Sequence, residues 1–167
     1  MKRQFSLFIF SLLTLLACRS DDDVVQDIDQ ILNIYIKNDA GQDLLNTKLD
    51  AHYTNVALLD LLETTDQKPV SSSIIMDKDS VRYVEYVAGA TRLIKDSINP
   101  DSKSYYSSMI MRFTKKITET QNSVDDDTIR IEYNWTPQKF EVSKMWHSKK
   151  LVFTKSDTQP NIVNIVK

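Results

Sequence analysis

Strict alternation of apolar and polar residues is the feature that most constrains the fold of this chain. It is clearest at residues 128–134 (TIRIEYN), and it recurs at residues 109–114 (MIMRFT) and 32–37 (LNIYIK). A period of two is that of a β-strand with one buried face. These segments are therefore predicted strands, and their apolar faces consist of Leu32, Ile34, Ile36, Met109, Met111, Phe113, Ile129, Ile131 and Tyr133.

Several other segments have strand character. Residues 81–87 (VRYVEYV) are apolar on both faces, which predicts a central or covered strand. Residues 140–146 and 151–153 are predicted to form a hairpin through a turn at 147–150, which lacks the Asn-Gly or Asp-Gly typical of a type I′ turn. Residues 162–166 form the last predicted strand.

Turn residues separate these strands. Turns are predicted at residues 38–43, where Gly41 is the candidate for positive φ, and at residues 99–102 and 123–127. The segment 55–63 (NVALLDLLE) fits a short helix or a strand, and its context favours a strand.

The composition suits one folded domain. Hydrophobic residues make up 41% of the 167-residue chain and charged residues 26%, so the chain can bury a core. Seven or eight short strands with turns about every 8–15 residues predict an all-β fold, a single antiparallel β-sandwich of the Ig-like or transthyretin-like kind, over residues 31–167.

The first 17 residues have the pattern of a signal peptide helix. Lys2 and Arg3 precede an apolar run at residues 5–16, which is shorter than the roughly 20 residues that span a bilayer. Ala17 is the small residue expected before a cleavage point. We therefore assign residues 1–17 to a signal peptide.

Residues 15–18 (LLAC) resemble the lipobox of bacterial lipoproteins, and Cys18 is the single cysteine of the chain. The resemblance implies that Cys18 is lipidated and becomes the first residue after cleavage; the alternative is an ordinary secretory signal. Two or three acyl chains would hold the protein on a membrane, whereas one binds only marginally. Residues 18–30 are then the lipidated cysteine followed by a disordered acidic tether.

Residues 20–23 (SDDD), which follow Cys18 closely, resemble an export signal. In lipoproteins of the Bacteroidota, such a cluster directs the protein to the outer face of the outer membrane. The resemblance implies an outer-membrane protein exposed at the cell surface; the alternatives are a solvated tether without signal function and the periplasmic face. The residues concerned are Ser20, Asp21, Asp22 and Asp23.

The body of the chain also resembles cell-envelope lipoproteins of the Bacteroidota. Residues 38–46 (NDAGQDLLN) look like a stretch near the start of their mature chains, and residues 127–133, 143–147 and 151–153 look like their C-terminal strands. The resemblance implies a small β-sandwich and carries no activity or site.

The composition excludes several kinds of chemistry. A formal net charge of -2 argues against a nucleic-acid partner. Gly41 and Gly89 are too far apart for a phosphate-binding loop. With Cys18 lipidated, only His52 and His147 remain as soft ligands, and His147 is expected to be solvated at its turn. We therefore predict no metal, no cofactor and no enzymatic activity.

Aromatic residues are the best candidates for recognition. Trp135, Tyr105 and Tyr106 lie towards strand ends, where they could stack on a sugar or anchor a protein; the alternative is core packing. By alternation, Tyr133 and Trp146 are predicted core residues. Three tripeptides look like the O-glycosylation acceptor of the Bacteroidota, with acceptors Ser80, Ser97 and Thr128.

The sequence thus predicts a lipid-anchored envelope lipoprotein that binds a protein or glycan partner without catalysis. The alternatives are a structural or assembly subunit of an envelope complex, or a hydrolase. An exposed aromatic patch far from Cys18 would favour binding. A continuous exposed sheet edge or apolar face would favour the structural role.

Overall fold

The computed structural model describes residues 25–64, 67–157 and 160–167. These residues form strands, turns and loops and no helix, so the prediction of an all-β fold is confirmed. The predicted signal peptide (residues 1–17), Cys18 and the proposed export signal lie outside the described residues.

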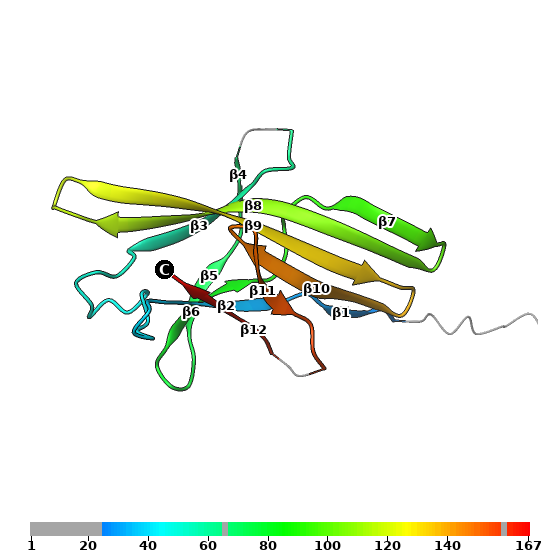
Figure 1. The fold of residues 1–167 in the computed structure, drawn as a ribbon, viewed down its shortest axis with the longest axis horizontal. Helices are drawn as coiled ribbons and strands as arrows, with labels where there is room; N and C mark the ends of the chain where they lie inside the picture. Colours follow the sequence, from blue (N-terminus) through cyan, green and yellow to red (C-terminus); the bar gives the residue numbers. More distant parts are fainter. Residues whose placement is uncertain (1–24, 65–66, 158–159) are drawn as a thin grey trace, which may run out of the picture.

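The larger of two sheets has eight strands (Figure 1). Its order is β1-β10-β9-β8-β3-β4, with β11 also paired to β10 and β7 also paired to β8. Its strands are β1 (Asp27–Asp29), β3 (Asn55–Asp60), β4 (Lys68–Val70), β7 (Leu93–Asn99), β8 (Ser102–Lys116), β9 (Asn122–Trp135), β10 (Lys139–His147) and β11 (Lys150–Thr154).

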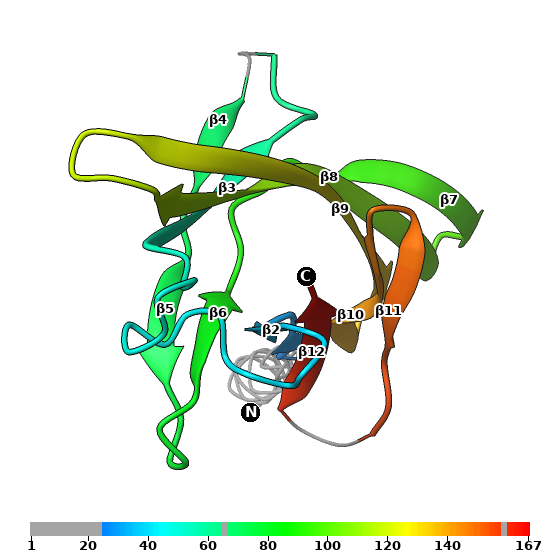
Figure 2. The same ribbon diagram turned by 60° about the vertical axis from the view of Figure 1, so that its left-hand side comes forward.

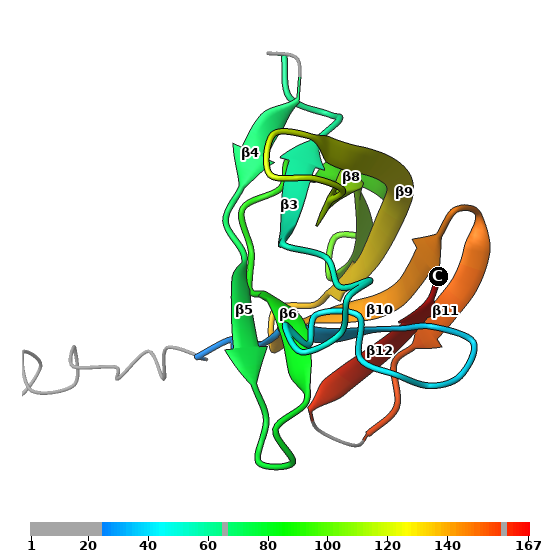
Figure 3. The same ribbon diagram turned by 90° about the vertical axis from the view of Figure 1, so that its left-hand side faces the viewer.

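The smaller sheet has four strands in the order β12-β2-β6-β5. Both sheets curl, and they face each other (Figures 2 and 3). The strands of this sheet are β2 (Leu32–Lys37), β5 (Ser73–Met76), β6 (Arg82–Tyr86) and β12 (Asn161–Val166).

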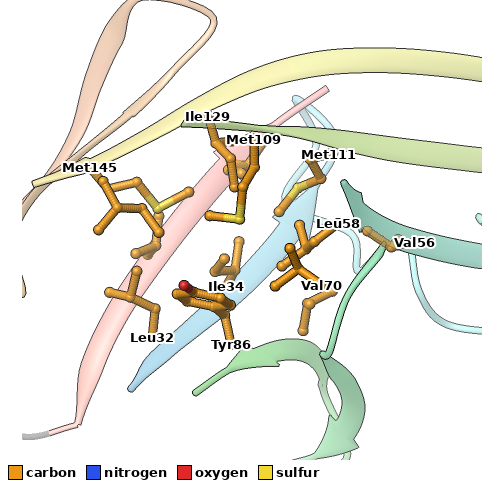
Figure 4. Close-up of a cluster of buried hydrophobic side chains, with 14 of the residues drawn as sticks. Leu32, Ile34, Val56, Leu58, Val70, Tyr86, Met109, Met111, Ile129 and Met145 are labelled. Atoms are coloured by element: carbon orange, nitrogen blue, oxygen red, sulfur yellow. The ribbon is translucent and has the colours of Figure 1, made fainter. Parts of the chain in front are cut away.

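The core lies between the two sheets (Figure 4). Leu32, Ile34 and Tyr86 of the smaller sheet point towards Met109 and Met111 of the larger one, and all five are fully buried. The inward faces predicted from alternation in β2, β8 and β9 are all buried. Their side chains are Leu32, Ile34, Ile36, Met109, Met111, Phe113, Ile129, Ile131 and Tyr133.

Two strand pairs are parallel, which the prediction of an antiparallel fold did not include. β1 pairs parallel with β10, and β12 pairs parallel with β2. Only two residues separate β1 from β2, yet the two strands lie in different sheets. The chain therefore crosses from the larger sheet to the smaller one between β1 and β2, and its last strand, β12, returns to pair with β2.

The folded part begins earlier than the sequence indicated. Residues 27–29 were placed in a disordered acidic tether because Asp27 and Asp29 continue its acidic character. In the structure they form β1, with Ile28 opposite Phe140. The carboxylate of Asp29 binds the Nζ atom of Lys155, so this acidic residue belongs to a partly buried ion pair of the folded domain and not to a solvated tether.

The local predictions for four other segments are confirmed. The ambiguous segment at residues 55–63 contains the strand β3, and β6 lies between β2 and β5 as expected for a central strand. Gly41 has a φ of 77° in its turn. Ser148 and Lys149 have φ values of 46° and 71°, so the β10–β11 hairpin has the two positive φ angles of a type I′ turn.

A β-bulge in β10 overturns the prediction for Trp146. The register with β9 shifts between Val142 and Lys144, which makes Ser143 an extra residue. A bulge exchanges the faces of all residues beyond it. Met145 therefore points into the core and is fully buried, whereas Trp146 lies half-buried on the outer face.

The acidic segment at residues 123–127 belongs to β9 rather than to a turn. The turn lies at residues 117–121, and the acidic segment continues the long hairpin with β8. An ion pair across the two strands supports this pairing: Arg112 Nη2 lies 2.6 Å from Asp126 Oδ2. Charged residues can occupy a strand where the partner strand supplies the opposite charge.

Candidate functional site: an aromatic groove beside Arg92

A groove with a volume of about 320 Å³ lies where β1, β8, β9 and β10 come together. The adjoining ends of these strands are on the right in Figure 1. Its walls come from segments that are far apart in the sequence. The lining residues are Gln26, Ile28, Gln30, Arg92, Tyr105, Trp135 and Phe140.

The sheet register sets the aromatic wall of the groove. Phe140 of β10 pairs with Trp135 of β9 on one side and with Ile28 of β1 on the other, so these three form one row on the same face. Tyr105 lies on that face in the neighbouring row, opposite Tyr133. The rings of Tyr105 and Phe140 meet edge to face, with centroids 6.4 Å apart.

Arg92 forms the polar wall. Its Cζ atom lies 4.8 Å from the ring centroids of both Tyr133 and Phe140. Its Nη2 atom donates a hydrogen bond to Gln30 Oε1 at 2.6 Å. Its Nε atom is buried and has no hydrogen-bond acceptor among the described residues. The guanidinium group is thus held in place by stacking and by one neutral contact.

The segment around β1 closes the third side of the groove. Gln26 Nε2 donates to the carbonyl oxygen of Thr136 at 2.6 Å, and the backbone N–H of Asp27 donates to the carbonyl oxygen of Gln138 at 2.8 Å. These contacts fix the segment against the turn between β9 and β10. The groove therefore depends on β1, which the sequence analysis had placed in the tether.

Two cations contact the aromatic wall of the groove. Arg92 is the single charged residue of its lining, and Lys103 Nζ lies 4.9 Å from the ring centroid of Trp135. Beneath the wall, burial raises the pKa of the Tyr133 hydroxyl well above its usual range. That hydroxyl stays protonated, and it lies 3.4 Å from the hydroxyl of Tyr86. The groove offers aromatic faces, amide groups and a cation, a set that suits binding of a ligand.

Two of the three aromatic residues singled out from the sequence meet in this groove. Trp135 and Tyr105 are half-buried and pack against the core with one side. Tyr106 does not join them, because alternation points it to the opposite face, where Arg130 Cζ lies 4.1 Å from its ring centroid. Gln26 follows Cys18 by eight residues in the sequence, and Cys18 itself lies outside the described residues.

The other lining residues were missed by sequence analysis. Phe140 lies in a predicted strand but was not among the candidates for recognition; it is 8% exposed and lines the groove. Arg92, Gln26 and Gln30 carry no local pattern, because each is brought to the groove by strand pairing over a long sequence distance. A single sequence holds no signal for that convergence.

The two histidines lie apart from the groove. His52 Nδ1 lies 2.5 Å from the carbonyl oxygen of Leu49. His147, which was expected to be solvated, is half-buried with Nε2 2.7 Å from Asp127 Oδ2. Within the described ranges, no group of three or more His, Cys, Asp or Glu residues is placed to hold a metal ion.

The three predicted O-glycosylation acceptors are exposed. Ser80 lies in the turn between β5 and β6, Ser97 on β7, and Thr128 on the outer face of β9. Their exposure is compatible with modification, which stays a prediction.

Comparisons of the chain with protein-family models, with curated proteins and with solved structures give no match. In the part of the chain that the structure describes, there is no helix with the length and apolar character needed to cross a bilayer.

Proposed function

We propose that this protein is a lipid-anchored outer-membrane module, displayed at the cell surface, whose sandwich-type β-domain binds a saccharide in the aromatic groove without catalysis. Cys18 would carry the lipid, and Ser20 with the following aspartates would direct export. Support for the anchor comes from the lipobox-like residues 15–18 and from a folded part that begins soon after them, at Asp27.

The row formed by Trp135, Phe140 and Ile28, flanked by Tyr105, is the observation that carries the binding proposal. Aromatic rings stack on the apolar faces of sugars, and a few polar groups fix the orientation of a bound ligand. The amide groups of Gln26 and Gln30 and the guanidinium group of Arg92 supply those polar groups.

The binding proposal is tested with the two tryptophans of the chain. In the full chain carrying Trp146→Phe, Trp135 is the sole tryptophan, so its fluorescence reports on the groove. We expect at least one member of a broad glycan array to bind and to change this fluorescence. Trp135→Ala removes the reporter, so its binding is measured on the glycan array itself. That binding should be weaker by about tenfold or more, since a side chain that anchors an interface contributes on the order of 2 kcal/mol or more.

Trp146→Phe is the matched control, because Trp146 lies on the outer face. Its affinity should equal that of the wild type. If no glycan on the array is bound, or if Trp135→Ala binds as tightly as Trp146→Phe, the groove is not a saccharide site.

The anchor is tested separately. Labelled palmitate should be incorporated into the wild type and not into Cys18→Ser, which should leave the membrane fraction. Protease added to intact cells should cleave the wild type. Retention and labelling of Cys18→Ser would disprove the anchor, and cleavage only after lysis would indicate the periplasmic face.

One observation favours the structural alternative. β7 pairs with β8 and with no other described strand, and Leu93 and Ile94 on it are exposed by 43% and 62%. An edge strand with exposed apolar residues can pair with another chain. A partner captured from envelope extracts by the wild type and lost with Ile94→Asp, but kept with Trp135→Ala, would support this role over saccharide binding.

A further inference from the structure

The charge of Arg92 is not balanced by any carboxylate in the part of the chain described. Two other arginines have acidic partners: Arg112 lies 2.6 Å from Asp126, and Arg130 lies 3.3 Å from Glu132. Arg92 instead bonds to the neutral amide of Gln30, and its buried Nε has no acceptor. A buried donor without a partner is costly, and more so when it belongs to a charged group.

The surroundings of the groove do not supply the missing charge. Asp27 and Asp29 flank the lining residue Ile28 on β1, so strand alternation directs both away from the face of Ile28. Asp27 is exposed and makes no ion pair with Arg92 among the described residues. Asp29 is bound to Lys155 and Asn161. Lys103, at the edge of the groove over Trp135, adds a second cation. The groove therefore presents aromatic rings next to two positive groups.

From this charge distribution we infer that the ligand of the groove is an acidic saccharide, whose sugar ring lies on Trp135 and Tyr105 and whose carboxylate binds the guanidinium group of Arg92. This inference rests on the proposed function and adds the ligand class to it. A guanidinium group offers several donors in a plane that matches a carboxylate, and such charge-assisted hydrogen bonds are stronger than neutral ones. Contact of the Arg92 guanidinium group with the rings of both Tyr133 and Phe140 keeps it oriented for binding the carboxylate.

The test compares acidic glycans with the same glycans after reduction of their carboxyl groups to alcohols. The full chain with Trp146→Phe is titrated with uronic-acid and sialic-acid oligosaccharides, with their carboxyl-reduced forms and with an Asp/Glu-rich peptide. At least one acidic glycan should bind about tenfold more tightly than its reduced form. The difference should shrink as ionic strength rises, because salt screens exposed charge pairs.

Arg92→Gln should lose most of the preference for the acidic glycan and keep at most the roughly twofold part that Lys103 supplies. Arg130→Gln is the matched control, because Arg130 also stacks on a tyrosine but on the outer face, and it should keep the wild-type preference. Should Arg92→Gln fail to fold, Lys103→Gln serves in its place and should reduce the preference about twofold, a smaller effect than loss of a direct contact.

The possible failures can be told apart. Equal binding of acidic and reduced glycans by the wild type would overturn the acidic ligand and leave saccharide binding in place. Absence of binding by every glycan would remove the proposed function and this inference together. Binding of the acidic peptide, with no glycan bound, would identify a protein partner and would likewise overturn the saccharide.

Discussion

The contacts of Asp127 illustrate what one carboxylate does on the long strand β9. Its Oδ2 atom lies 2.7 Å from His147 Nε2 and also binds the Nζ atom of Lys167. Burial raises the pKa of the Asp127 carboxyl, but the hydrogen bonds from Lys167 and His147 outweigh burial and hold it below the ordinary value of 3.8. The ionised form is therefore the one that the folded chain stabilises.

Asp127→Asn should lower the free energy of unfolding near neutral pH by about 1.5–3 kcal/mol, the range for a hydrogen bond to a charged group. A carboxyl whose pKa is lowered on folding contributes stability above its unfolded pKa and loses it as the pH falls through its folded pKa. The difference in melting temperature between wild type and variant should thus be largest near neutral pH and vanish below the lowered pKa. Thermal unfolding followed by circular dichroism across this range measures it.

Asp126→Asn is the control for this prediction. Asp126 pairs with Arg112, and the side chains of both are exposed by about a third. An exposed ion pair contributes little, so Asp126→Asn should cost less than Asp127→Asn at neutral pH. An equal loss of unfolding free energy for the two variants would mean that the contacts of Asp127 with Lys167 and His147 stabilise the fold no more than the exposed pair of Asp126 with Arg112 does.

At the scale of the element, one residue inserted in β10 decides which side chains reach the core. Met145→Ala should lower the free energy of unfolding by about 2–4 kcal/mol, because Met145 is fully buried. Trp146→Ala removes a larger side chain but should cost less than half as much, since Trp146 lies on the outer face beyond the bulge. Urea unfolding of the two variants tests this order. A larger loss of unfolding free energy for Trp146→Ala would mean that Trp146, and not Met145, points into the core as uninterrupted alternation predicts.

The same bulge marks how far the sequence could predict this fold. Alternation identified the buried faces of β2, β8 and β9, because one buried face repeats every second residue wherever the strand is regular. Alternation failed for Trp146, because no feature of the sequence around Ser143 indicates the β-bulge that shifts the register there. It also failed for residues 27–29, whose partners Phe140 and Lys155 lie more than a hundred residues away.

The candidate site divides in the same way. Trp135 and Tyr105 could be singled out from the sequence, because aromatic residues near strand ends are common at binding surfaces. Arg92 and Gln30 could not, because their contact joins segments 62 residues apart. The position of Arg92 in the groove therefore follows from the three-dimensional fold and could not be predicted from the local sequence.

At the scale of the whole molecule, strands from the two ends of the described chain pair with each other. β12 pairs parallel with β2 and contributes the fully buried Val163 and the nearly buried Ile165 to the core. This pairing joins residues about 130 positions apart, as in the hydrogen bond from Asn161 Nδ2 to the carbonyl oxygen of Ile31 at 2.9 Å. Such long-range parallel pairing is slow to form, so folding should complete only when the last strand docks.

Asn161 joins the three segments that meet at this closure. Its Nδ2 atom donates to Asp29 Oδ1 at 2.8 Å, and its Oδ1 atom accepts from Lys155 Nζ at 2.7 Å. The residue is 2% exposed, and removal of its amide would take one hydrogen bond each from Asp29, Lys155 and the carbonyl group of Ile31. β1, the end of β11 and β12 are thus connected through one side chain.

Asn161→Ala should therefore lower the free energy of unfolding by about 2 kcal/mol or more and loosen β1 as well as β12. Asn164→Ala is the matched control, because Asn164 lies on the exposed face of the same strand and should change stability by about 0.5 kcal/mol or less. Hydrogen exchange should show faster exchange at residues 27–29 in Asn161→Ala alone. Since β1 forms one wall of the groove, the same variant should also weaken ligand binding, and unchanged exchange in β1 would mean that the groove is held independently of the last strand.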